Sequence, residues 1–133
     1  MSKPGPQGYV LNRTRRQFLA TRVAVANTHW SRLWGLIGRR PASFAGGHAL
    51  WIIPCRGVHT LGMRFPIDVV YLDQHNTVVH IEQRLSPWRF APVRLKAASV
   101  LELPENTLCS TGTTIGDELE IDTRTSGTAR QPA

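Results

Sequence analysis

The chain has 133 residues, of which 41% are hydrophobic, and it carries a formal net charge of +7. This length suits a single domain that buries its core without metal or disulfide staples. The apolar residues occur in short blocks, which excludes the run of about 18 apolar residues that predicts a membrane-spanning helix. The N-terminal sequence MSKPGPQGYV lacks the apolar core of a signal peptide, so we expect a cytoplasmic protein.

The positive charge is concentrated in the first half of the chain. No Asp or Glu precedes Asp68, and residues 1–66 carry ten Lys and Arg residues, a net charge of +10. The remainder has six Lys and Arg against nine acids, a net charge of −3, which gives the total of +7. Such a segment can contact nucleic acid or an anionic membrane surface, here through Arg13, Arg15, Arg16, Arg39 and Arg40. It can equally be a solvated basic surface without a partner, and this is the interpretation that we favour. No DNA-binding motif accompanies the charge, so nucleic acid is not the partner that we expect.

The ends of the chain and its first elements differ in composition. Residues 1–16 predict a flexible basic arm, and residues 123–133, rich in Thr, Ser, Gly and Pro, predict a disordered tail. Gln17–Thr28 alternates its side chains and predicts a half-buried strand. The apolar residues between Trp30 and Ile37 have helical spacing, which predicts a short helix. His48–Ile53 is a continuous apolar run and predicts a buried strand.

The second half of the chain predicts a β-hairpin followed by further short strands. Phe65–Leu72 and Thr77–Gln83 are strand-like and are joined by a polar four-residue turn. Leu85–Pro92 predicts an ordered loop whose aromatic side chains lie on the sheet, and Ala97–Leu103 predicts another strand. One helical turn and a last strand at Glu118–Ile121 complete the domain. This pattern predicts a mainly β, antiparallel sandwich or barrel-like single domain with one or two short helices.

Several segments resemble a known family and occur in its order. They are RLWGLIGR (Arg32–Arg39), CRGVHTLGMRFPIDVVYLD (Cys55–Asp73), VLELP (Val100–Pro104) and the Gly116–Asp117 pair with Leu119. Together they resemble the DUF192 family of small bacterial and archaeal proteins, which has no assigned biochemical function, over residues 17–122. The resemblance implies a compact, mainly β, sandwich-like domain. It supplies no catalytic residues, so a site must be argued from chemistry.

The candidate site is the loop that precedes the hairpin, together with the start of the next strand. It gathers thiol, cationic, hydroxyl and acidic side chains, namely Cys55, Arg56, His59, Thr60, Arg64 and Asp68. Gly57 and Gly62 allow backbone angles that other residues resist, so the loop can fold tightly and present these side chains to a cleft.

Two chemical interpretations use Cys55 and His59. A thiol nucleophile would need the imidazole within hydrogen-bond reach of the thiol, and Asp68 could orient the ring. A metal site would need His48 or Cys109 as a further ligand, but the sequence lacks the paired spacing of known zinc sites. Both cysteines fit free thiols. We therefore predict no catalytic residue, no metal and no cofactor, and keep a small enzyme as the alternative.

A binding interpretation and a structural one remain. Arg56 and Arg64 could hold a carboxylate or phosphate, with His59 and Thr60 as further donors. The protein would then be a non-catalytic binding or accessory module for an anionic small ligand or an acidic protein partner. In the structural interpretation the loop is a corner, in which Thr60 closes a turn and Asp68 accepts a loop amide or pairs with an arginine. The sequence leaves both open.

Overall fold

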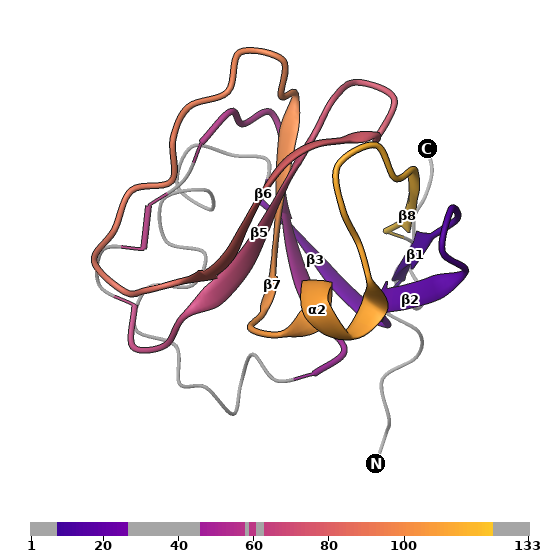
Figure 1. The fold of residues 1–133 in the computed structure, drawn as a ribbon, viewed down its shortest axis with the longest axis horizontal. Coiled ribbons are helices and arrows are strands. Elements are labelled where there is room, and N and C mark those ends of the chain that lie inside the picture. Colours follow the sequence, from indigo (N-terminus) through magenta and orange to yellow (C-terminus); the bar gives the residue numbers. More distant parts are fainter. Residues whose placement is uncertain (1–7, 27–45, 58, 61–62, 124–133) are drawn as a thin grey trace, which may run out of the picture.

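The computed structural model describes residues 8–26, 46–57, 59–60 and 63–123. They form a mainly β domain with two sheets, as the sequence predicts (Figure 1). The smaller sheet has three strands in the order β2-β1-β8, and the larger has five in the order β3-β4-β7-β5-β6. No helix in these ranges is long and apolar enough to cross a membrane.

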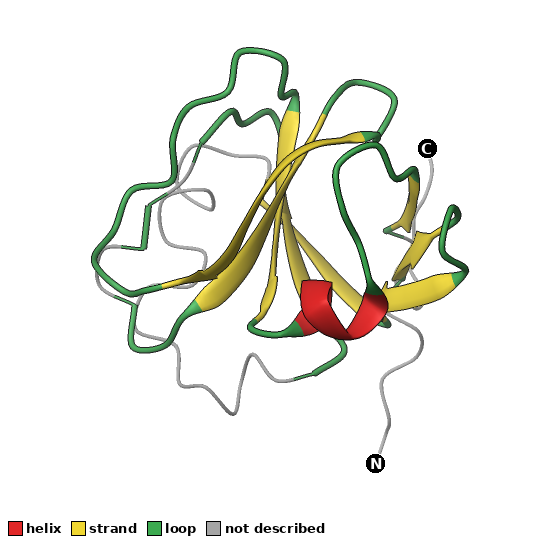
Figure 2. Ribbon diagram, viewed as in Figure 1, coloured by secondary structure: helices red, strands yellow, loops and turns green. Residues whose placement is uncertain are grey.

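The elements are short, and the described residues contain a single helical segment (Figure 2). The strands are β1 (Tyr9–Asn12), β2 (Gln17–Ala20), β3 (Arg22–Ala26), β4 (His48–Ile52), β5 (Ile67–Leu72), β6 (Val78–Leu85), β7 (Ser99–Pro104) and β8 (Leu119–Asp122). The helix is α2 (Thr107–Thr111), which lies between β7 and β8. The predicted strands of the second half and the predicted helical turn are therefore present.

The predicted hairpin is formed by β5 and β6, which pair antiparallel. In its turn the carboxylate of Asp73 accepts hydrogen bonds from the backbone N–H groups of His75 (2.8 Å) and Thr77 (3.0 Å). Asn76 completes the turn with a φ of 62°, a left-handed conformation that Asn tolerates. Every residue of β5 is buried, because the strand lies between β7 and β6 and a cluster of apolar side chains covers each of its faces.

Residues 9–12 differ from the flexible arm that the sequence predicts, because they form the central strand of the smaller sheet. β1 pairs antiparallel with β2 and, across more than a hundred residues of chain, with β8. Its alternate residues Val10 and Asn12 are buried. The amide of Asn12 donates to the carboxylate of Asp117 (2.9 Å) and to the hydroxyl of Thr113 (3.0 Å). These distant partners order a segment whose composition looks disordered.

The predicted strand Gln17–Thr28 is divided at Thr21 into β2 and β3, which lie in different sheets. At the division the backbone N–H groups of Thr21 and Arg22 both donate to the carbonyl of Gly47 (2.8 and 2.9 Å). β3 then pairs in parallel with β4. The sequence predicts an antiparallel fold, and this parallel pair departs from that prediction. The helix predicted between Trp30 and Ile37 lies outside the described residues.

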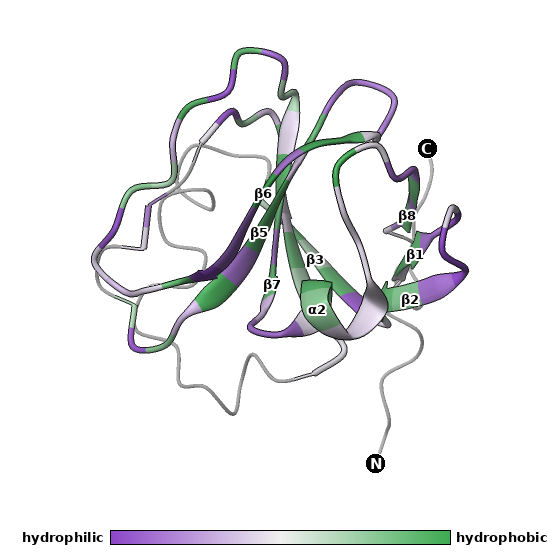
Figure 3. Ribbon diagram, in the orientation of Figure 1, coloured by the Kyte–Doolittle hydropathy of each residue, from purple (hydrophilic) through white to green (hydrophobic). Residues whose placement is uncertain are grey.

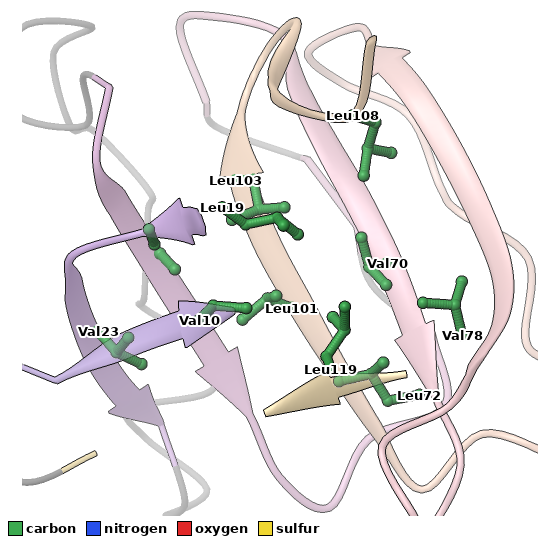
Figure 4. Close-up of a cluster of buried hydrophobic side chains, with 12 residues drawn as sticks. Val10, Leu19, Val23, Val70, Leu72, Val78, Leu101, Leu103, Leu108 and Leu119 are labelled. Carbon is green, nitrogen blue, oxygen red and sulfur yellow. The ribbon is translucent and has the colours of Figure 1, made fainter. Parts of the chain in front are cut away.

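Two buried apolar clusters lie on opposite faces of the larger sheet, because successive side chains of β5 and β7 alternate between them. We call the first the inter-sheet core, since both sheets contribute to it; Figure 4 shows it with Val10, Leu19, Val23, Val70, Leu72, Val78, Leu101, Leu103, Leu108 and Leu119. We call the second the loop-side core; its buried members are Ala26, Leu50, Ile52, Met63, Phe65, Ile67, Val69, Tyr71, Ala91, Ala97 and Val100. The predicted site loop belongs to this second side.

Candidate functional site

The thiol of Cys55 lies at the edge of the loop-side core. The residue is half-buried and packs against that core. Its S–H donates to the carbonyl of Gly57 (2.9 Å), and its backbone N–H donates to the carbonyl of Ala98 (3.0 Å). Both cysteines of the chain are free thiols, and Cys109 is exposed. The Cys55 proton therefore points to a backbone carbonyl, which cannot act as a base.

The next two residues support the chain segment that leads into β7. Arg56 Nε donates to the carbonyl of Ala97 (3.3 Å), and the Arg56 carbonyl accepts the backbone N–H of Arg94 (2.9 Å). Gly57 approaches this segment so closely that an added Cβ would lie 3.2 Å from Val93 Cα. Glycine is the residue that permits such contact between two backbones. Residues 55–57 thus hold the 93–98 segment in place.

Thr60 fastens the following part of the loop to the residues after β6. It is fully buried, and its hydroxyl donates to the carbonyl of Ser86 (2.6 Å) and accepts the backbone N–H of Arg89 (2.8 Å). Its own N–H donates to the Arg89 carbonyl (2.8 Å), and its carbonyl accepts the N–H of Trp88 (2.9 Å). The neighbouring His59 forms an isolated antiparallel β-bridge with Phe90. Their rings meet edge to face, with centroids 6.2 Å apart. Thr60 therefore holds the loop and the residues after β6 together.

The aromatic side chains after β6 do not lie on the sheet, so that prediction for Leu85–Pro92 is wrong. Trp88 is 66% exposed and Phe90 is 73% exposed. Trp88 also has a φ of 64°, in the left-handed region that disfavours side chains with a Cβ. Holding a residue there costs about 1–2 kcal/mol, which the four hydrogen bonds of Thr60 offset.

Asp68 lies on the inter-sheet face, away from the Cys55 side. It is buried, Oδ1 accepts the backbone N–H of Arg84 (2.9 Å), and Oδ2 accepts that of Leu108 (2.9 Å). It thereby ties β5 to the end of β6 and to the first turn of α2. Of the predicted site residues, the structure brings Cys55, Arg56, His59 and Thr60 against the segment 86–98, leaves Arg64 exposed and separates Asp68 from them.

The described residues do not have the geometry that a thiol nucleophile or a metal site would need. Cys55, His59 and Asp68 do not form a catalytic triad, because Asp68 faces the inter-sheet core. Both of its carboxylate oxygens already accept backbone N–H groups there. Within the part of the chain that the structure describes, no three His, Cys, Asp or Glu side chains converge as a metal site. His48, the other predicted ligand, begins β4.

A pocket that the sequence did not predict lies beside β6. It has a volume of about 400 Å³ and is lined by Val79, His80, Val93, Arg94, Leu95 and Lys96. Its walls combine apolar side chains with cationic ones. The alternation of apolar and basic residues in VRLK was a signal in the sequence, but only the return of this segment along β6 creates the pocket.

His80 stands at the inner edge of this pocket between an acid and a cation. Its Nε2 lies 2.7 Å from Glu82 Oε2 and 3.3 Å from a guanidinium nitrogen of Arg94. One ring nitrogen cannot serve both, because it either donates its proton to the carboxylate or accepts one from the guanidinium. When His80 Nε2 donates to Glu82, it cannot accept from Arg94, so the guanidinium of Arg94 can donate to a different acceptor.

Tyr71 contacts both sides of the pocket, at His80 in β6 and at the Pro92 carbonyl next to Val93. Its ring meets that of His80 edge to face at 5.0 Å, and its hydroxyl donates to the carbonyl of Pro92 (2.6 Å). Burial, reinforced by the charge of Glu82, raises the pKa of the Tyr71 hydroxyl above its ordinary value. The hydroxyl therefore stays protonated and remains a donor at Pro92, which fixes the segment that forms the outer wall.

Glu102 is a further residue that sequence reasoning missed. It lies in β7, with Leu50 and Val69 as its neighbours across the sheet, so it shares the face of the loop-side core. It is only 4% exposed, and among the described residues no hydrogen-bond partner meets its carboxyl group. Burial raises the pKa of Glu102 to about 8. Nothing in the sequence VLELP separates this acid from one that is solvated at a strand edge.

Comparison with known proteins gives the family but no activity. The DUF192 family, described as "Uncharacterized ACR", matches residues 10–121. A UPF0127 protein of Thermococcus sibiricus is 28% identical over 116 residues, covering 84% of this chain and 73% of its own. A UPF0127 protein of Pyrococcus furiosus is 29% identical over 116 residues, covering 84% and 96%. The crystal structure of a protein of unknown function from Novosphingobium aromaticivorans has the same fold, with a TM-score of 0.73, 18% identity, and coverage of 90% and 93%.

Proposed function

The chain belongs to the DUF192 family, and we propose that it is a non-catalytic binding module for a small anion that carries an apolar group. The pocket between β6 and residues 93–96 supports this proposal, because it joins cationic and apolar walls in a volume of about 400 Å³. Ligand sites of proteins are commonly concave, mostly apolar and of this size, with a few polar groups that orient the ligand.

The two kinds of wall suit the two ends of such a ligand. Arg94 offers a planar guanidinium that can hold a carboxylate or phosphate through two hydrogen bonds, and Lys96 adds a second positive charge. Val79, Val93 and Leu95 offer the apolar surface. None of the residues that line the pocket is acidic, and the nearby Glu82 is engaged by His80.

The predicted site loop takes a supporting part in this proposal. Cys55 and Arg56 bind the backbone of the segment that forms the outer wall, so they position the pocket without lining it. The thiol proton of Cys55 rests on a carbonyl oxygen, which cannot remove it.

Isothermal titration with three compounds that carry a tail of seven or eight carbons tests the proposal. Octyl phosphate and octanoate share an apolar tail with uncharged octyl glucoside, and we expect both anions to bind about tenfold more tightly than the glucoside. Arg94→Gln should lower the affinity for the anions about tenfold, because it removes the charged donor. Arg89→Gln is the matched control, since Arg89 is exposed outside the pocket, and it should leave binding unchanged.

Equal binding of the anions and the glucoside would overturn the proposal, as would equal loss in the two arginine variants. Loss of binding through Cys55→Ser, with the fold and the Arg94 response intact, would instead place the ligand against the thiol.

A further inference from the structure

The connection from Ser86 to Lys96, which we call the 86–96 connection, carries unusually exposed apolar side chains. Trp88 and Val93 are each 66% exposed, Phe90 is 73% exposed and Leu95 is 81% exposed. These are the four most exposed large hydrophobic residues of the part that the structure describes. Exposed apolar side chains that gather in one place mark interaction surfaces, whereas single ones need no explanation.

The same connection is positively charged. Arg89, Arg94 and Lys96 alternate with its apolar residues, Arg84 precedes them, and all four are exposed. No Asp or Glu lies between Arg84 and Ser99. Figure 3 shows this alternation of hydrophobic and hydrophilic residues along the segment that leaves β6 and returns to β7 at the outer side of the molecule.

The apolar side chains are held outward by a fixed backbone. Thr60 bonds the residues around Trp88 at four points, and Arg56 bonds the backbone of Arg94. Tyr71 bonds the carbonyl of Pro92. A surface that is ordered before it meets a partner loses less conformational entropy on binding. Strain at Trp88, together with its exposure, points to a role outside the fold itself.

We propose that the 86–96 connection docks the protein onto an anionic membrane surface, with Trp88 and Phe90 at the level of the lipid headgroups. Trp88 suits that level because its large ring is apolar while its indole N–H can meet water, and Phe90 adds apolar surface beside it. Arg89, Arg94 and Lys96 then face the phosphates of anionic lipids, whose attraction adds to that of the apolar contacts.

A lipid surface fits this connection better than an acidic protein does. Trp88 and Phe90 are not among the residues that line the pocket, and the segment between β6 and β7 that contains them runs along the outside of the molecule (Figure 1). A layer of anionic lipids carries negative headgroups above an apolar interior everywhere. The connection can therefore bind it without a set of acidic side chains placed opposite each of its cations. The inference uses exposure and charge along the connection, and it does not rest on the proposed function of the pocket.

Flotation of the full chain with lipid vesicles tests the proposal. We expect the protein to float with vesicles of equal parts phosphatidylcholine and phosphatidylglycerol, and to stay behind with pure phosphatidylcholine. Added salt should release it, because salt screens the attraction of the cations. Trp88→Ser combined with Phe90→Ser should lower the bound fraction about tenfold, since both apolar contacts are lost. Ile115→Ser is the control, because Ile115 is also exposed (57%) but lies between α2 and β8.

Absence of flotation with the anionic vesicles would overturn the proposal, and so would an equal loss in the Ile115→Ser variant. Binding of soluble polyglutamate without binding of vesicles would favour an acidic protein partner and would also overturn the proposal. Titration of the Trp88→Ser, Phe90→Ser variant with octyl phosphate separates the two proposals, because pocket binding should survive there. Arg94→Gln should lower octyl phosphate binding about tenfold but flotation only in part, because Arg89, Lys96 and the two aromatic residues still contact the vesicle.

Discussion

The two faces of the larger sheet treat their buried acids differently. On the inter-sheet face, Asp68 is enclosed and both of its carboxylate oxygens accept a backbone N–H group. On the opposite face, Glu102 is equally enclosed, but no hydrogen-bond partner among the described residues meets it. Buried polar groups are nearly always hydrogen-bonded, so the inter-sheet face follows the rule and the loop-side face breaks it.

The buried Asp117 extends this comparison to the smaller sheet. Burial alone would raise the pKa of Asp117, but hydrogen bonds from Asn12 (2.9 Å), Arg15 (3.0 Å) and the backbone of Thr114 (3.1 Å) outweigh it and lower the pKa. Asp117 therefore adds stability above its ordinary pKa range, and that stability is lost as the pH falls through its folded pKa. Glu102 has the opposite dependence.

The difference between the faces teaches where the chain is built for stability and where it is available for function. The acids of the inter-sheet side join strands and α2 into one unit. The loop-side face combines an unpaired acid, a left-handed Trp88 and an exposed basic connection. Departures from local rules concentrate at functional sites, because function requires groups that the fold alone would not select.

The largest test of the comparison is Asp68→Ala. It leaves the buried N–H group of Leu108 and the partly buried N–H group of Arg84 without an acceptor, so we expect the free energy of unfolding to fall by about 3 kcal/mol. Urea denaturation followed by circular dichroism measures this change. Asp73→Ala is the control, because Asp73 also accepts two amides but does so in the hairpin turn, and it should cost about 1 kcal/mol. Similar losses in the two variants would show that Asp68 is not a special link.

The second test is the pH dependence that Glu102 imposes. Below its ordinary pKa of 4.5 the carboxyl is protonated in the folded and unfolded states alike, so it has no differential effect. As the pH rises toward about 8 the unfolded chain ionises first, and the folded state loses relative stability. We expect a loss of roughly 3 kcal/mol between pH 5 and pH 8 in the natural chain.

Glu102→Gln should remove this slope, because the amide carries no charge at any pH. Urea denaturation at several pH values compares it with Glu105→Gln, whose parent side chain is exposed and should leave the slope as it is. The same slope in the Glu102 variant and in the natural chain would mean that Glu102 ionises without cost in the folded protein.

The smallest test concerns the backbone of Trp88. Because its φ of 64° suits glycine, Trp88→Gly should be more stable than Trp88→Ala by about 1 kcal/mol. Both variants remove the same exposed side chain, so their difference in thermal unfolding reports the backbone alone. An alanine variant as stable as the glycine variant would show that this turn relaxes and that no strain is held there.

Local pattern alone determined much of the larger sheet. The apolar run His48–Ile53, the hairpin around Asp73–Asn76 and the predicted strand Ala97–Leu103 all match the structure within two residues. These elements depend on alternation and turn chemistry, which neighbouring residues carry in themselves. The motif order also placed the chain in the DUF192 family, which the family match confirms.

Part of the candidate site could also be predicted from the sequence. The structural interpretation of Asp68 expected a loop amide or an arginine as its partner; the structure gives two backbone amides, one in β6 and one in α2. For Thr60 the sequence predicts only that it closes a turn. Its actual partners, Ser86 and Arg89, lie on another segment, and nothing local to Thr60 indicates them. The pocket and the exposure of Trp88 depend on how two loops pack together, and no spacing within either loop encodes that.

Only the tertiary structure decided how the remaining segments are used. Residues 9–12 become a strand because β8 supplies partners from the far end of the chain, and Thr21 divides one apparent strand between two sheets. Asp68 and Glu102 read alike as acids within strands, yet one meets two amides and the other meets apolar side chains. Sequence thus determined the elements, because propensity is local, while the structure decided partners and exposure, because these depend on residues far apart in the chain.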